Sequence, residues 1–395
     1  MKKNIYLLII CMLICLFLTS CWNRVELNRL AIVMAMGIDK SEKNDTYKIT
    51  YQVVKPGQVA SMKGSSTSGG QDSSPVIIYE ETGKTLFEAI RKNTKKIPRK
   101  LLFSHMRVII ISKDVAKDGI RSLMDLLERD HEMRDNMRVF VTVDEKASDV
   151  VNVLDPLEKI PANAIIQEIE ITKMNWAHNT DVQISDVIHS ITKEGTGPLI
   201  PGIAIKKTNK KTILEINKMG LFRKDKLISW IDGDTARGVS WVNGEVNSTV
   251  VTSKCSNKQG NVSFEVLRSK TKNNVNIING EPQMNVNIYA EANIGELVCN
   301  IAVSKPEVIK QLELMLADKI KSEAITAIKS AQSEKSDVFG FDKIIMRKNP
   351  KYWKNNKSNW GILFSNAVVS VKVEVFVRRT GLRIDNLEKN YKTSY

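Results

Sequence analysis

The feature that most constrains this chain is its first twenty residues, which join a positive start to an uncharged apolar run. Lys2 and Lys3 supply the positive charge, and residues 5–17 form an apolar segment without a charged side chain. A helix that spans a bilayer needs about 20 apolar residues, and this run ends sooner. The pattern predicts a signal peptide over residues 1–20 that is cleaved. We therefore expect the rest of the chain to fold on the outer side of a membrane.

Cys21 is the candidate attachment point of that chain to the membrane. The small residues before it resemble a lipobox, in which the cysteine receives a diacylglycerol thioether, becomes the first residue after cleavage and is then N-acylated. Two acyl chains of roughly 15 methylenes each, at about 0.8 kcal/mol per methylene, give an anchor on the order of 20 kcal/mol. The alternatives are a signal peptide with an incidental cysteine and an uncleaved N-terminal anchor.

Composition and charge describe a basic globular protein. The 395 residues are enough for two or three domains after cleavage, and the apolar and charged fractions of 42% and 26% are ordinary for a folded chain. The formal net charge is +15, of which Lys2 and Lys3 contribute 2. An exported basic protein meets anionic headgroups or wall polymers before nucleic acid, so we favour a membrane surface and expect no nucleic-acid partner.

Cysteine usage leaves one question open. Cys11 and Cys15 lie in the predicted leader and Cys21 is the predicted lipid site. Only Cys255 and Cys299 remain, so that one disulfide is possible and none is required.

The N-terminal half alternates between strand and helix patterns. They are strands over 47–54, 76–79, 107–112 and 137–143, and helices over 85–96, 115–129, 147–154 and 184–192. Thr85 and Glu88 are spaced as a capping box, and Pro156 and Pro161 are expected to break the chain. We interpret the Ser- and Gly-rich residues 61–75 as a flexible insertion. This alternation predicts an α/β domain.

The C-terminal half changes to strand patterns with one long helix. The expected strands cover 202–206, 212–216, 226–230, 248–253, 262–269, 275–278, 284–292 and 369–377. Such a series indicates an antiparallel sheet, and we expect the last strand to complete the sheet that begins near Gly202. Ser304 and Glu307 are spaced as a second capping box, with Pro306 in the first turn of a helix that reaches about Ser330.

Together these patterns predict a mixed α/β, multi-domain (α+β) protein. We divide it into an N-terminal α/β domain over 21–200, a β-rich middle domain over 201–303, and a C-terminal domain over 304–395 that holds the long helix and the terminal strand.

The sequence offers no constellation of catalytic, cofactor-binding or metal-binding residues. The four histidines are His105, His131, His178 and His189, and none has metal-ligand spacing. A nucleophile elbow, a Walker loop and a dinucleotide-binding glycine pattern are all missing. We interpret His105 as a structural residue, and the charged residues 128–132 as a solvated helix end rather than an acid/base pair.

Two basic stretches are candidate contact surfaces. Residues 92–100 carry five cations around Ile97-Pro98, and such a run is most often a solvated face. In residues 343–360, lysines and arginines interleave with Tyr352, Trp353 and Trp360. That composition suits a lipid headgroup interface, although burial of the aromatic rings in the core is favoured. Either stretch could also face a membrane-protein partner.

Several motifs resemble those of the Ger(x)C lipoproteins, the C subunits of nutrient germinant receptors in spore-forming bacteria. They are residues 21–27 (CWNRVEL), 35–39 (AMGID), 83–89 (GKTLFEA), 101–109 (LLFSHMRVI) and 126–130 (LLERD). The resemblance covers essentially the whole chain, with fewer motifs in the C-terminal half. One departure is Asn23, where the family commonly has Asp.

The resemblance implies a non-enzymatic, lipid-anchored subunit on the outer face of the spore inner membrane. It implies assembly with two polytopic partners, the A-type and B-type germinant receptor subunits, and a three-domain α/β architecture. Only Cys21 carries over as a functional residue, no cofactor is implied, and germinant binding by this subunit itself is doubtful.

Two other classes of function compete with this interpretation. An extracytoplasmic solute-binding lipoprotein would capture a small ligand in a cleft between two similar lobes and deliver it to a transporter. The change near residue 200, from alternating strand and helix patterns to mostly strand patterns, argues against similar lobes. An exported hydrolase would need a nucleophile arrangement that the sequence does not display.

Overall fold

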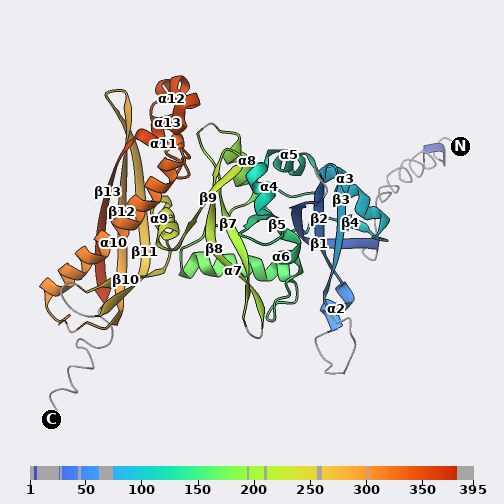
Figure 1. Cartoon of the computed structure of the whole chain (residues 1–395), viewed down its shortest axis with the longest axis horizontal. Helices are drawn as coiled ribbons and strands as arrows, with labels where there is room; N and C mark the ends of the chain where they lie inside the picture. Colours follow the sequence, from blue (N-terminus) through green and yellow to red (C-terminus); the bar gives the residue numbers. More distant parts are fainter. Residues whose placement is uncertain are drawn as a thin grey trace, which may run out of the picture.

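The computed structural model describes residues 4–6, 26, 29–42, 46–61, 74–193, 195–208, 211–255, 260–299, 301 and 303–379. Cys21, nearly all of the predicted leader and most of the predicted insertion over 61–75 lie outside these residues. Within the described ranges the chain forms two sheets that lie side by side along the long axis of the molecule (Figure 1).

The first sheet has nine strands and mixed direction. They are β1 (Leu30–Lys40), β2 (Tyr47–Val54), β3 (Val76–Gly83), β4 (Lys100–Leu102), β5 (Val108–Ile111), β6 (Arg138–Thr142), β7 (Leu199–Lys207), β8 (Thr212–Arg223) and β9 (Lys226–Asp232). The spatial order is β3-β2-β1-β5-β6-β7-β8-β9, with β4 paired to the start of β1. The central strands β1, β5, β6 and β7 are parallel, and antiparallel strands flank them on both sides.

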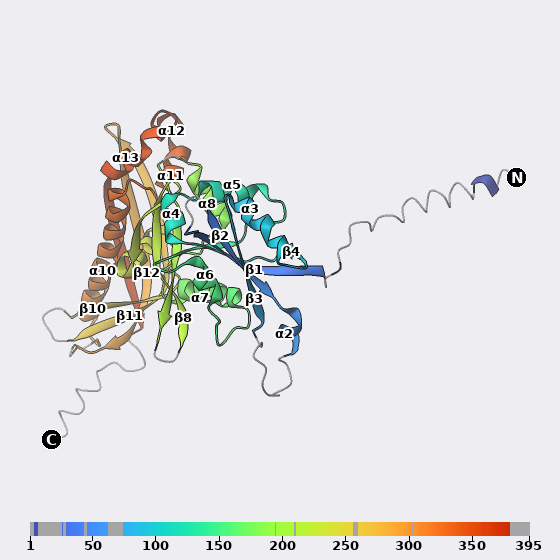
Figure 2. The ribbon, with the colours of Figure 1, turned by 45° about the vertical axis from the view of Figure 1, so that its right-hand side comes forward.

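Helices cover both faces of this sheet. They are α2 (Pro56–Ser61), α3 (Leu86–Lys92), η2 (Asn93–Lys95), α4 (Lys113–Asp118), α5 (Arg121–Arg129), α6 (Ala147–Asn152), α7 (Pro161–Asn175) and α8 (Ile184–Ile191). Helices α3, α4, α5 and α8 pack on one face and α6 and α7 on the other, each over its own apolar core. Figure 2 shows the same two layers from the side. Because both faces are covered, β5 is buried at every residue.

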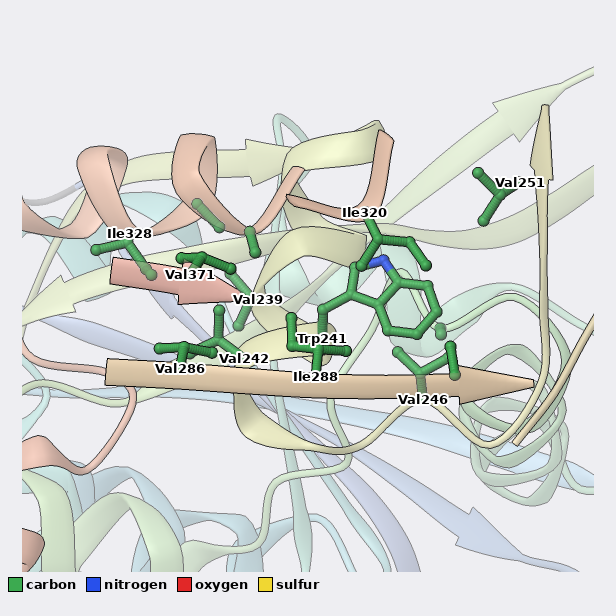
Figure 3. Close-up of a cluster of buried hydrophobic side chains, with 14 of the residues drawn as sticks. Val239, Trp241, Val242, Val246, Val251, Val286, Ile288, Ile320, Ile328 and Val371 are labelled. Carbon is green, nitrogen blue, oxygen red and sulfur yellow. The ribbon is translucent and has the colours of Figure 1, made fainter. Parts of the chain in front are cut away.

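The second sheet has four strands and one covered face. Its strands are β10 (Thr249–Lys254), β11 (Asn261–Ile278), β12 (Glu281–Leu297) and β13 (Val368–Arg379), in that order, with β13 parallel to β12. Its helices are α9 (Gly233–Asn243), α10 (Pro306–Ser333), α11 (Phe341–Lys348), α12 (Pro350–Asn356), η3 (Lys357–Asn359) and α13 (Trp360–Asn366). Side chains of α9, α10, β12 and β13 converge around the buried Trp241 (Figure 3).

Several local expectations are confirmed. The strand over 47–54 is β2, and α3 begins after Thr85, whose hydroxyl accepts a hydrogen bond from the Glu88 amide at 3.1 Å. Pro306 occupies the first turn of α10, which ends at Ser333. The alternation at 369–377 forms β13, with Val371 and Val375 buried. The mixed α/β, multi-sheet fold class is also confirmed.

Three local expectations are wrong, and one helix was missed. The helix over 115–129 is two helices, because Gly119 adopts φ +130° between α4 and α5. Pro161 does not break the chain but starts α7, where its missing N–H costs nothing. Helix α9 was not expected at all. Ser304 makes no capping box, because the residue that precedes α10 is Lys305 and has no side-chain cap.

Strand pairing also differs from the expectation for the C-terminal half. The strands between 199 and 232 extend the first sheet, so β13 does not complete a sheet that begins near Gly202, and it pairs with β12 instead. One sheet therefore crosses residue 200, and the other takes strands from both sides of residue 303. The predicted division into three domains stays a prediction.

Candidate functional site

The one predicted site residue, Cys21, lies outside the described residues. The first described strand after it is β1. Strand β1 starts at Leu30, which is paired with Lys100 of β4. Both strands lie at the end of the long axis opposite the second sheet (Figure 1). We call the edge at which the parallel strands β1, β4, β5 and β6 begin the anchor-proximal end, because β1 starts nine residues after the predicted lipid site.

A cavity of about 560 Å³ opens at the anchor-proximal end. We call it the basic cavity. It is lined by Ile32, Met34, Val54, Ser104, His105, Met106, Arg107, Arg134, Asn136, Arg138, Ile160 and Asn163. Three arginines and a histidine face it together with five apolar side chains, and no carboxylate is among its lining residues.

Sheet hydrogen bonds and α7 fix the positions of these side chains. The Arg107 amide donates to the Met34 carbonyl at 2.9 Å, and the Arg138 amide donates to the Arg107 carbonyl at 2.8 Å. The Gln52 side chain accepts a hydrogen bond from the Ala162 amide at 3.2 Å, which sets the start of α7 over the cavity. The cavity wall is thus built from regular structure.

The three arginines differ in their partners. Arg138 is held by both carboxylate oxygens of Asp181 at 3.0 and 3.1 Å and by Glu170 at 3.0 Å. The hydrogen bonds that Arg138 donates to the Asp181 carboxylate raise the pKa of Arg138. Arg107 donates to the neutral amide oxygen of Asn163 at 2.8 Å. Within the described ranges, neither Arg107 nor Arg134 has a carboxylate partner, so their charges remain available to an anion.

The family-like AMGID segment has a structural role beside this site. Asp39 is buried, and its two carboxylate oxygens accept the Ala147 and Ser148 amides at 2.7 and 2.8 Å, which caps α6. Burial raises the pKa of Asp39 despite these bonds. A Cβ on Gly37 would come within 3.0 Å of the Val151 side chain. The motif therefore joins β1 to α6.

A second candidate region is the contact between the two sheets, which we call the joint and which residues 195–197, Phe222 and residues 336–337 form. The Ser336 hydroxyl donates to the Phe222 carbonyl at 2.6 Å, and the Asp337 amide donates to the Gly195 carbonyl at 3.1 Å. A Cβ on Gly197 would lie 1.9 Å from the Phe222 carbonyl oxygen. The Gly-Thr-Gly turn is therefore packed backbone against backbone.

Asp337 is the central acid of this joint. Its carboxylate accepts the Phe339 and Asp342 amides at 3.1 and 2.8 Å and the Trp360 indole at 3.0 Å. Burial raises the pKa of Asp337, and the neighbouring Asp342 adds to the effect. These bonds hold α11 and α13 onto the turn, which is a structural role.

A buried ion cluster joins α9 to α10. Arg237 donates to both oxygens of Glu323 at 2.9 and 2.6 Å, and the Trp241 indole donates to Glu323 at 3.1 Å. The side chains of Arg237 and Glu323 are 4% and 2% exposed. His178 lies 3.3 Å from Arg237, and burial, with the arginine charge second, lowers the pKa of His178 to about 4.

In the two basic stretches, several lysines form ion pairs with nearby acids and the aromatic rings pack against the protein. In the first, Lys92, Lys96 and Lys100 pair with acids at 2.7 to 2.9 Å, as expected of a solvated face. In the second, Trp360 is fully buried and Trp353 packs against it edge-on at 5.6 Å. Burial in the core is confirmed for Trp360, whereas Tyr352 and Trp353 are half-buried against that core and the lysines of α12 are exposed.

His105, which we interpreted as a structural residue, is exposed and lines the basic cavity, and that interpretation stays a prediction. Arg129 pairs with the exposed Asp125 at 2.9 Å, which fits a solvated end of α5. Cys255 and Cys299, whose pairing was left open, form a disulfide between the ends of β10 and β12.

Among the residues that the structure describes, no group of His, Cys, Asp and Glu side chains is arranged to hold a metal ion. No helix in the same ranges is both long and apolar enough to cross a membrane.

Sequence reasoning did not find the basic cavity. Arg107, Arg134 and Arg138 lie outside the two basic stretches, and the parallel pairing of β1, β5 and β6 brings them together. The available signal was that Arg107 and His105 lie in the family-like motif 101–109.

Comparison with known proteins supplies the family. Residues 23–205 match the model described as spore germination protein N-terminal domain, and residues 217–381 match the C-terminal model described as spore germination B3/GerAC like. The chain is 28% identical to spore germination protein KC of Bacillus subtilis (strain 168), over 99% of this chain and 100% of that protein. It is 27% identical to spore germination protein A3 of the same organism, over 95% of this chain and 98% of that protein.

A solved structure has the same fold. The crystal structure of the GerBC protein aligns with a TM-score of 0.56 at 20% identity and covers 87% of this chain and 97% of that chain. With both domain models matched in tandem and relatives aligned end to end, the chain belongs to the Ger(x)C family of spore germination proteins.

Proposed function

We propose that this protein is the lipid-anchored, non-enzymatic C subunit of a nutrient germinant receptor. It is tethered through Cys21 to the outer face of the spore inner membrane after its signal peptide is removed. It supports the germination response through contacts with the polytopic A-type and B-type subunits. The observation that carries the proposal is the end-to-end match to spore germination proteins. The N-terminal family model begins at residue 23, two residues after the predicted lipid site.

The described structure supports a role in contacts rather than in chemistry. Asp337, whose pKa is raised, and His178, whose pKa is lowered, are both held in packing contacts, Asp337 by Asp342 and Trp360 and His178 beside Arg237. The basic cavity lies at the end where the chain leaves for Cys21. The two sheets differ in strand number, direction and coverage, so the two-lobed solute-binding alternative gains no support.

The anchor is tested by labelling cells with an alkyne fatty acid. The wild-type protein and Cys15→Ala should incorporate the label, because Cys15 is expected to leave with the leader. Cys21→Ala should incorporate none and should impair nutrient-triggered germination. Labelling of Cys21→Ala at the wild-type level would refute the anchor.

The partners are tested by affinity purification of the full chain from membranes in mild detergent. Recovery of two polytopic proteins with the wild-type chain is the expected result. Their absence in several mild detergents would count against the receptor assignment, and a melting temperature that rises with a nutrient alone would favour the solute-binding alternative.

A further inference from the structure

The cavities at the anchor-proximal end differ in charge from those elsewhere. Of five cavities in the described chain, three are each lined by at least two carboxylates. The other two lie on opposite faces of the start of β1 and contain none. In a chain with 44 acidic residues, this places two acid-free cavities at the strand that leads to Cys21.

The basic cavity combines an anion-binding rim with an apolar floor. Arg107, Arg134 and His105 are exposed at its rim, and the side chains of Ser104 and Asn136 add further hydrogen-bonding groups. The floor is apolar and consists of Ile32, Met34, Val54, Met106 and Ile160. Guanidinium groups match the geometry of phosphate oxygens. A volume of about 560 Å³ is of the size that holds a small molecule or a headgroup.

The position of the cavity indicates where such a group would come from. The chain between Cys21 and Leu30 reaches at most about 30 Å when extended, at about 3.4 Å per residue. If Cys21 is acylated, Ile32, the first β1 residue of the cavity, therefore lies within about 40 Å of the membrane surface. Anionic headgroups are then the most concentrated phosphate available to the cavity.

We propose that the basic cavity binds the headgroup of an anionic phospholipid, with Arg107 and Arg134 on the phosphate and the apolar floor against the glycerol and upper acyl carbons. The proposal rests on the proposed membrane attachment at Cys21. It gives the subunit a second contact that fixes its orientation on the membrane, whereas the acyl chains alone fix only its distance. An acidic peptide segment is the competing occupant, and nothing near the cavity favours one.

The test uses the mature chain, residues 21–395 with Cys21→Ala, which carries neither the predicted leader nor the acylation site, and mixes it with vesicles in a flotation assay. Without acylation, vesicle binding reports the folded surface alone. We expect binding to phosphatidylcholine vesicles that contain phosphatidylglycerol, and little binding to pure phosphatidylcholine. Arg107→Gln/Arg134→Gln should weaken the partition coefficient roughly 10- to 30-fold, because each cation near an anionic surface adds about one kilocalorie of attraction.

The matched control is Lys351→Gln/Lys354→Gln in α12, which removes the same charge from the second basic stretch. It should weaken binding by less than about 3-fold. Equal losses in the two double variants would show attraction to net charge and overturn the proposal. A larger loss in the α12 variant would move the membrane contact to that helix and would also overturn it.

Three further arms separate the remaining explanations. Soluble glycerol phosphate should compete with vesicles for the wild-type cavity only at high concentration, and complete competition at low concentration would identify a free phosphate compound as the ligand. Protection from heat by a hexaglutamate peptide but no vesicle binding would identify a protein segment instead. Arg107→Lys/Arg134→Lys keeps the charge but loses the guanidinium geometry, so its binding should fall between that of the wild type and that of the glutamine variant. Unchanged melting temperatures confirm that each variant folds.

Failure here and failure of the anchor are distinguishable. The fatty-acid label reports Cys21 in the acylated protein, while the flotation assay uses a chain that cannot be acylated at that position. A labelled protein whose basic-cavity variant binds vesicles normally would keep the anchor and discard the headgroup site.

Discussion

The two sheets differ in how many of their faces are covered by helices. The first is covered by helices on both faces, and its central strand β5 is buried throughout. The second is covered on one face only, and outward residues such as Lys372 and Glu374 alternate with buried valines along β13. A one-sided sheet has a single core, so it depends more on individual cross-links. The second sheet carries both the disulfide and the buried Arg237–Glu323 pair.

The largest expected effect tests that dependence at the buried ion cluster. Glu323→Gln leaves the Arg237 guanidinium buried without its main carboxylate, so the free energy of unfolding should fall by about 3–5 kcal/mol. Urea denaturation of the full chain measures it. Glu374→Gln, on the exposed face of the same sheet, should change stability by less than about 0.5 kcal/mol. Equal effects would mean that the cluster does not stabilise the second sheet.

The disulfide is the next largest contribution, and it belongs to the second sheet alone. Cys255 and Cys299 are separated by 44 residues, and a bridge that closes such a loop typically adds about 2–4 kcal/mol. Reduction should therefore speed amide hydrogen exchange in β10–β12 and leave β1, β5 and β6 unchanged. Faster exchange in the first sheet as well would show that the two sheets unfold as one unit.

The turn between the sheets provides the third test. Gly197→Ala places a Cβ against the Phe222 carbonyl oxygen, and relief of that overlap should cost roughly 1–3 kcal/mol. Gly57→Ala in α2, where a Cβ meets nothing within 4 Å, should be neutral or slightly stabilising. Similar melting temperatures for the two variants would contradict the close backbone packing of the joint.

The sequence predicted elements whose pattern is local. The alternation of β13, the apolar stripe of α10 and the Thr85 cap of α3 each depend on residues within a few turns. It failed where a residue has two possible roles. Pro161 either breaks a helix or starts one, and the apolar spacing of Ala162, Ile165 and Ile169 was the signal that favoured a start.

Longer-range features could not be predicted from local pattern. The assignment of β7–β9 to the first sheet and of β13 to the second depends on which edges are free, which periodicity does not encode. Helix α9 was missed because it contains Gly238 and a buried arginine. Gly238 lets α9 approach α10, since a Cβ there would lie 2.2 Å from the Glu323 carbonyl oxygen. The basic cavity requires the same long-range pairing.

The smallest expected effect is the pH dependence at His178, next to the ion cluster. The pKa of His178 is lowered to about 4 in the folded chain from 6.5. Between these values the unfolded chain binds the proton and the folded chain does not, so stability falls as pH drops from 6.5 to 4. After allowance for partial exposure, this loss should be on the order of 1 kcal/mol.

The control is His178→Gln. Burial raises the pKa values of Glu168 and Asp337, so these two acids make stability rise as pH falls, and they do so in both the wild type and the variant. The variant should lose less stability than the wild type between pH 6.5 and pH 4.5. Parallel stability curves would place His178 outside the cluster that joins α9 to α10.

The account depends most on the claim that the chain is tethered at Cys21, beside the anchor-proximal end of the first sheet. Mass spectrometry of the N-terminal peptide, from protein purified out of spore membranes, tests it directly. We predict a peptide that begins at Cys21 and carries a diacylglycerol thioether, with or without an N-acyl group. A peptide that begins at Met1, or an unmodified Cys21, would contradict the account.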